Sequence, residues 1–113
     1  MKKFVCHIKD LKDHQSYGFQ IPLDTGELDI VVIRQGSAVR AYLNHCPHLG
    51  IPLNWQPDKF LSLEETHIQC STHGALFTLE EGYCISGPCR GQSLTALQTE
   101  VDAQNDLYLV SDQ

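Results

Sequence analysis

The chain has 113 residues, of which 42% are hydrophobic and 19% are charged, and its formal net charge is -6 at pH 7. This length and composition predict a single globular domain over residues 1–113. The acidic balance argues against binding to nucleic acid or to an anionic membrane surface. No stretch approaches the roughly 20 apolar residues that cross a bilayer, and we recognise no signal peptide, so the sequence predicts a cytoplasmic protein.

Short apolar and β-branched segments, separated by turn residues, predict an all-β fold with almost no helix. The expected strands cover residues 4–8, 17–21, 28–34, 38–43, 60–63, 66–69, 75–79, 83–85, 94–101 and 107–110. Segment 28–34 is the most apolar, so we expect it to be the central core strand. Segment 10–15 is polar and forms a helical turn at most. Together these strands predict an antiparallel β-sandwich or open barrel.

Two short loops carry the residues with metal-binding chemistry. Residues 46–50 read Cys-Pro-His-Leu-Gly, here called the first ligand loop, and residues 70–74 read Cys-Ser-Thr-His-Gly, here called the second ligand loop. Each loop offers one thiol and one imidazole, at Cys46 and His48 and at Cys70 and His73. We expect both loops at hairpin tips, where a rigid scaffold can bring them together.

The mixed pairing of Cys and His favours one of two possible metal centres, a [2Fe-2S] cluster, over the other, a zinc ion. Structural zinc sites usually pair Cys with Cys and His with His, although zinc remains an alternative here. A [2Fe-2S] cluster in which two His replace two Cys on one iron needs one ligand of each kind from each loop. The chain has five cysteines, an odd number, which favours thiols and metal ligands over a disulfide framework.

The two loops, together with Phe77, the Glu81-Gly82 turn and the Ser86-Gly87-Pro88 segment, resemble Rieske proteins of the small soluble ferredoxin type. The resemblance extends over nearly the whole chain. It implies a Rieske-type β-fold with the two ligand loops at one end and one [2Fe-2S] cluster. Cys46 and Cys70 would hold the inner iron, and His48 and His73 the outer iron through Nδ1.

The same resemblance implies a low reduction potential. High-potential Rieske proteins carry an extra Cys in each ligand loop, joined as a disulfide, where this chain has Ile51 and Thr72. They also carry a Ser and a Tyr after the second loop, where this chain has Ala75 and Phe77. Neither replacement can donate a hydrogen bond to a cluster sulfur, so we expect a potential in the lower part of the Rieske range.

Several further residues have expected roles. Gly50 and Gly74 are expected to let backbone amides approach the cluster, with an ordinary turn role as a compatible alternative. Leu49, Ala75 and Pro88 are expected to form the contact surface for partners. The remaining histidines and cysteines are not expected to be ligands: His7, His14, His45, His67, Cys6, Cys84 and Cys89. A redox pair between Cys84 and Cys89 remains an alternative. The segment around Trp55 is expected to be a surface insertion, with a docking role as the alternative.

No nucleophile, acid–base pair or small-molecule pocket is recognisable, so we expect an electron-transfer component without a catalytic site of its own. Rieske oxygenases continue into a large catalytic domain, which we do not expect here. The predicted function is to carry single electrons between a flavin reductase and an oxygenase or similar acceptor. Two alternatives are the small subunit of a nitrite-reductase-like complex and a zinc-stabilised or redox-sensing interaction module.

Overall fold

The structure is a computed structural model, and its description covers residues 2–23, 26–45, 53, 60–61, 66–70, 74–87 and 90–110. These residues form short β-strands and one 3-10 turn, η1 (Ile8–Asp10). The strands are β1 (Lys2–His7), β2 (Gln15–Leu23), β3 (Gly26–Gln35), β4 (Ala38–Leu43), β5 (His67–Gln69), β6 (Leu76–Thr78), β7 (Cys84–Ser86), β8 (Ala96–Leu97), β9 (Thr99–Val101) and β10 (Asp106–Val110). No helix in the described part of the chain is long and apolar enough to cross a membrane.

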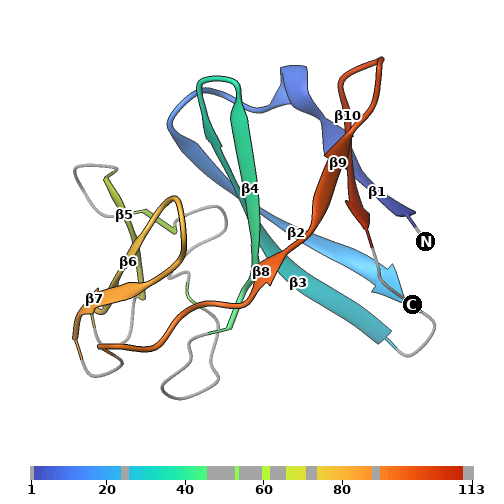
Figure 1. Cartoon of the computed structure of the whole chain (residues 1–113). Helices are drawn as coiled ribbons and strands as arrows, with labels where there is room; N and C mark the ends of the chain where they lie inside the picture. Colours follow the sequence, from blue (N-terminus) through green and yellow to red (C-terminus); the bar gives the residue numbers. More distant parts are fainter. Residues whose placement is uncertain are drawn as a thin grey trace.

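The strands form three antiparallel sheets, which confirms the predicted all-β fold (Figure 1). Sheet A has the order β1-β10-β9, sheet B has the order β2-β3-β4-β8, and sheet C has the order β5-β6-β7. Sheets A and B curve towards each other on one side of the molecule, and sheet C stands on the other side (Figure 1). Sheet C carries the second ligand loop between β5 and β6.

Strand β3 is buried on both faces, as its continuous apolar run indicates. Ile30 and Val32 belong to a core that also contains residues of sheet A, whereas Val31 and Ile33 belong to a core shared with sheet C. Successive side chains of a strand point to opposite faces. The Ile-Val-Val-Ile sequence therefore supplies two apolar residues to each core and holds the three sheets together.

The predicted strand 94–101 is divided into two strands, which corrects the sequence analysis. β8 pairs with β4 in sheet B, with Ala41 opposite Leu97, and β9 pairs with β10 in sheet A, with Thr99 opposite Leu109. The chain passes from one sheet to the other at Gln98, whose carbonyl accepts a 3.0 Å hydrogen bond from Val110 N–H. Of the apolar residues in this segment Leu94 is buried, but Ala96 and Val101 are exposed, and the alternation does not record which sheet each half joins. In the predicted strand 60–63, the described residues 60–61 show an isolated bridge from Leu61 to Ile68.

Tyr42 on β4 connects sheet B to sheet C. Its hydroxyl donates a 2.8 Å hydrogen bond to the Leu79 carbonyl, next to the turn between β6 and β7. Burial raises the pKa of the Tyr42 phenol, so the hydroxyl stays protonated and able to donate. Gly82 lies against the ring, since a Cβ at this position would be 2.8 Å from Tyr42 Cε1. A side chain cannot be added at residue 82 without moving Tyr42 or the turn.

We predict that Tyr42→Phe loosens sheet C. The buried Leu79 carbonyl would lose this donor, and local opening should become about tenfold more frequent, equivalent to roughly 1.4 kcal/mol. Hydrogen exchange of peptides covering residues 76–84, followed by mass spectrometry under native conditions, measures this change. Tyr83→Phe is the control, because Tyr83 is exposed. Equal exchange in the wild type and Tyr42→Phe would contradict the prediction.

Candidate metal centre

The second ligand loop is closed at its base by two backbone hydrogen bonds. Cys70 follows β5 directly and is fully buried. Its N–H donates to the Ala75 carbonyl at 2.9 Å, and Gly74 N–H donates to the Cys70 carbonyl at 2.9 Å. The two bonds fix the ends of a tight loop on neighbouring strands. A Cys in this position has a defined backbone, buried in the core that sheets B and C share.

Gly74 has the backbone of a turn glycine. Its φ of +67° lies in the left-handed region, which glycine adopts at low cost. Among the described residues, the nearest atom to a Cβ at this position would be Gln69 Nε2 at 3.9 Å. Its amide donates to Cys70 O and closes the loop. The expected turn role is therefore confirmed, and the approach of backbone amides to the cluster stays a prediction.

Gly87, after β7, lies directly on the end of the second ligand loop. A Cβ on Gly87 would be 2.8 Å from Ala75 Cα and 2.9 Å from Ala75 Cβ, and its φ is +104°. Ala75 is fully buried. The expectation that Ala75 contacts partner proteins is therefore wrong, because the Gly87 backbone covers it.

Phe77 on β6 is fully buried and lies opposite Ile68 and Cys84 in the sheet register. Like Ala75, it offers no hydroxyl. The two positions that would carry hydroxyl donors in high-potential Rieske proteins are therefore apolar and packed.

Two other cysteines, Cys6 and Cys84, lie within the described residues. Cys84 is buried in the same core as Cys70, and its Sγ donates to the Ser86 carbonyl at 3.2 Å. Cys6 on β1 lies in the core between sheets A and B, where burial raises the pKa of its thiol to about 11. Both are buried thiols outside any disulfide.

The described histidines outside the ligand loops lie on strands or at the surface. His67 is on β5 and half-buried, with its Nδ1 2.9 Å from Thr66 Oγ1. His7 contacts the Asp106 carboxylate, and His14 Nδ1 lies 3.1 Å from Asp13 Oδ1. His45 is exposed.

Three of the four predicted ligands, Cys46, His48 and His73, lie outside the described residues. Within the described ranges, no group of three or more His, Cys, Asp or Glu side chains is placed to hold a metal ion. Other predicted features also lie outside these ranges: Leu49, Gly50, Ile51, Trp55, Thr72, Pro88 and Cys89.

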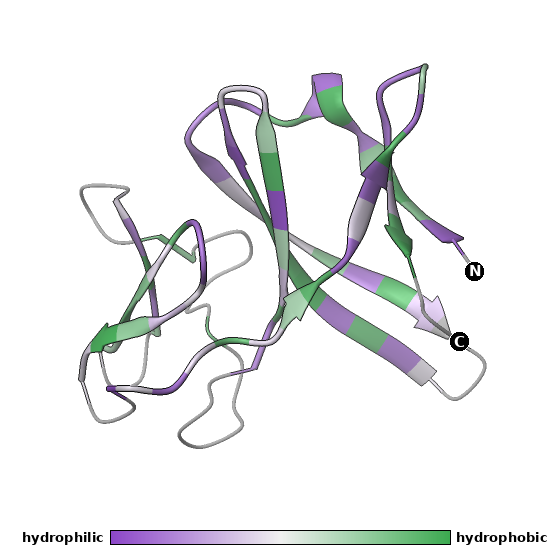
Figure 2. Ribbon diagram, viewed as in Figure 1, coloured by the Kyte–Doolittle hydropathy of each residue, from purple (hydrophilic) through white to green (hydrophobic). Residues whose placement is uncertain are grey.

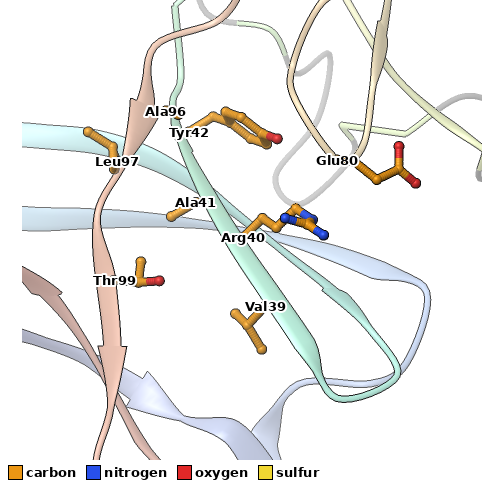
Figure 3. Close-up of a pocket in the computed structure, with 8 residues that line it drawn as sticks. All are labelled: Val39, Arg40, Ala41, Tyr42, Glu80, Ala96, Leu97 and Thr99. Atoms are coloured by element: carbon orange, nitrogen blue, oxygen red, sulfur yellow. The ribbon is translucent and has the colours of Figure 1, made fainter.

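A cavity of about 180 Å³ lies away from the second ligand loop, between β4, the turn before Gly82 and the β8–β9 segment. Arg40 and Glu80 are its charged lining residues (Figure 3). The Arg40 Nε atom is buried and has no hydrogen-bond partner in the part of the chain that the structure describes. Its described lining contains no Cys or His side chain, so it does not offer the metal ligands that the loops carry.

With this geometry established, comparison with known proteins assigns the family. Residues 1–103 match the Rieske [2Fe-2S] domain. The chain belongs to the Rieske family. A search of curated protein sequences found no match.

Solved structures share the fold across the whole chain. The ferredoxin of carbazole 1,9a-dioxygenase from Nocardioides aromaticivorans IC177 is 23% identical, with a TM-score of 0.75 over 97% of each chain. A chain in the complex of reduced oxygenase and oxidized ferredoxin in carbazole 1,9a-dioxygenase is 23% identical, with a TM-score of 0.74 over 96% of this chain and 92% of that one. The putative NADH-dependent nitrite reductase small subunit from Mycobacterium tuberculosis is 17% identical, with a TM-score of 0.71 over 100% and 96%.

The Rieske domain implies a [2Fe-2S] cluster, and the described part of the site fits this group. Cys70 is a buried potential thiolate ligand at the base of a hydrogen-bonded loop. Gly87 provides a surface without a side chain beside that loop. The surroundings are apolar, with Ala75 and Phe77 packed behind Cys70 in one core, as a cluster protected from water requires.

We predict that Gly87→Ala destabilises the metal centre. The added Cβ would overlap Ala75 and displace the second ligand loop, so the variant should lose its cluster severalfold faster in air than the wild type. The decay of visible absorbance, together with iron released per chain, measures this loss.

Gly91→Ala is the matched control. Gly91 also has a positive φ, +92°, but a Cβ there would meet no atom of the described residues within 4 Å. Gly91→Ala therefore introduces the same kind of backbone strain as Gly87→Ala, but without the overlap with Ala75. Equal cluster lifetimes in the two variants would show that the Gly87–Ala75 contact does not support the site.

Proposed function

We propose that this single-domain protein is a cytoplasmic electron carrier that holds one Rieske [2Fe-2S] cluster. The observation that carries the proposal is the Rieske domain match, which spans residues 1–103, together with the buried Cys70 at its hydrogen-bonded loop. When bound, the cluster would accept and donate one electron at a time. The protein itself would need only to hold the cluster and to bind its redox partners.

In the proposed site, Cys46 and Cys70 bind one iron as thiolates, and His48 and His73 bind the other through Nδ1. This assignment rests on the Cys-x-His and Cys-x-x-His spacings and on the ligand set of Rieske centres. The imidazoles would lie at the outer side of the cluster, where their second ring nitrogens can exchange protons with solvent.

For its partners we propose a flavin reductase as electron donor and an oxygenase as acceptor. Support comes from the structural match to the complex of oxygenase and ferredoxin in carbazole 1,9a-dioxygenase. A second candidate is a subunit role like that of the nitrite reductase small subunit, which the chain also matches over its whole length. Reconstitution with each type of partner, with NADH oxidation as the readout, separates the two.

Metal analysis tests the cofactor. We expect about two iron and two acid-labile sulfide per chain and a coloured protein. Cys70→Ser should abolish the visible absorbance, because one thiolate ligand is lost. Cys84→Ser is the control: Cys84 is buried in the same core but is not a proposed ligand, so this variant should keep the cluster. A colourless protein with zinc and no iron would overturn the proposal in favour of the zinc module.

The reduction potential provides an independent test. We expect a value below about +150 mV at pH 7, in the lower part of the Rieske range. Reduction would make His48 and His73 hold their ring protons more tightly, so electron uptake should be coupled to proton uptake and the potential should fall as pH rises. Redox titration followed by visible circular dichroism between pH 6 and pH 10 measures both. A potential independent of pH over this range would contradict ligation by the two histidines.

A further inference from the structure

Two large apolar side chains are exposed at and next to β7. Four large hydrophobic residues of the described chain are markedly exposed: Phe4 (50%), Tyr83 (46%), Val101 (45%) and Ile85 (40%). Tyr83 lies immediately before β7 and Ile85 lies on it, on either side of the buried Cys84, and Figure 2 shows the ribbon of β7 as hydrophobic. Isolated exposed apolar residues are common, but two so close together on the segment that leads to Gly87 point to a contact surface.

A β-bulge places Ile85 in this position. Leu76 pairs with Ser86 and Phe77 pairs with Cys84, so Ile85 is the extra residue of β7 between two paired positions. Bulges redirect side chains and occur frequently beside functional sites. The strand then leads to Gly87, which lies against Ala75 at the end of the second ligand loop. The chain therefore runs from the exposed segment directly to a backbone contact with Ala75, the residue after the second ligand loop.

The free edge of β7 is already paired, so a partner cannot add a strand there. Cys84 N–H donates to the Gln92 carbonyl at 2.8 Å, and Tyr83 forms a bridge with Ser93. Binding must therefore use the side chains of β7.

Charged residues stand at both ends of this surface. Glu80 and Glu81 are exposed in the turn before β7, and Arg90 is exposed in the turn after it. Glu80 lines the cavity of Figure 3 together with Arg40, whereas Glu81 is not among the residues that line it. The whole chain carries a charge of -6. A partner that meets the Glu81 end must therefore present basic groups.

We propose that Tyr83 and Ile85, with Glu81 at the rim, form the docking surface for a redox protein whose electron-exchanging site is ringed by lysine and arginine. This inference rests on the proposed electron-carrier function. An apolar centre with a charged rim matches a transient complex, in which charge speeds encounter and the apolar residues hold the contact. Arg90, in the turn after β7, would repel the basic groups of such a partner. The partner would therefore bind in the orientation that places its basic groups near Glu81 and away from Arg90.

Electron transfer to cytochrome c tests the proposal, because this haem protein has a lysine-ringed haem edge. The protein is reduced with dithionite, excess dithionite is removed by gel filtration, and oxidised cytochrome c is added in a stopped-flow instrument. One electron leaves the reduced cluster and converts one ferric haem to ferrous haem. The second-order rate constant is measured at low and at high ionic strength.

We expect Glu81→Gln to lower this rate constant by roughly threefold at low ionic strength and to weaken its salt dependence. Arg90→Gln should raise the rate constant. Ile85→Thr and Tyr83→Ser should lower it at both ionic strengths, because they remove apolar contact. Glu81→Gln and Arg90→Gln are expected to change the rate constant in opposite directions. Because both residues are exposed, these two variants still test the docking surface if an apolar variant loses its cluster.

Two control variants make the same kinds of substitution on β9, away from the proposed docking surface. Glu100→Gln removes the same charge from β9, and Val101→Thr makes the same kind of change as Ile85→Thr at an equally exposed position. Both should reduce cytochrome c at the wild-type rate. If Glu100→Gln slows the reaction as much as Glu81→Gln, only the total charge matters and the docking surface is wrong.

Ferricyanide separates failure of this inference from failure of the carrier function. This small acceptor needs no docking surface, so every variant that keeps its cluster should reduce it at the wild-type rate. Normal ferricyanide reduction with unchanged cytochrome c rates in the β7 variants would overturn the docking surface and leave the carrier function intact. A wild-type protein that reduces neither acceptor would overturn both. Dimerisation of the wild type that Ile85→Thr abolishes would assign the surface to a second copy of this chain instead.

Discussion

The structure depends on the burial of β3 on both of its faces. Ile30 and Val32 complete the core between sheets A and B, and Val31 and Ile33 complete the core between sheets B and C. A small chain has little apolar surface to bury, and a shared central strand lets the same few residues support two cores. The sheet that carries the second ligand loop is therefore built directly on the sheet that organises the rest of the fold.

The contacts between sheets B and C make the backbone around Cys70 rigid. Tyr42 extends from sheet B to the Leu79 carbonyl, Gly82 fits against its ring, and Gly87 lies on Ala75 beside Cys70. These contacts hold β6 and β7 in place, and the hydrogen bond from Cys70 N–H to the Ala75 carbonyl ties the backbone at Cys70 to them. A carrier that gains and loses electrons benefits from such rigidity, because little reorganisation accompanies each transfer.

Sequence patterns predicted the local features well and the neighbours of each residue less well. The apolar run of β3, the hairpin from β3 to β4 and the burial of Cys6 and Cys84 follow from residue type and turn signals. The division of segment 94–101 at Gln98 and the burial of Ala75 under Gly87 do not. Both depend on which distant segment lies alongside, and alternation along one strand contains no information about that.

The sequence by itself predicted the ligand chemistry: two loops each pair Cys with His, which favours a Rieske centre over zinc. The match of residues 1–103 to the Rieske [2Fe-2S] domain agrees with this preference. That prediction is possible because ligand type and spacing are local properties of the chain. Only the tertiary structure decided that the Gly74 amide closes the loop, that Tyr42 joins two sheets, and that Tyr83 and Ile85 face solvent beside the loop. Those facts arise from contacts between segments far apart in the chain, and they exist only once the sheets have packed.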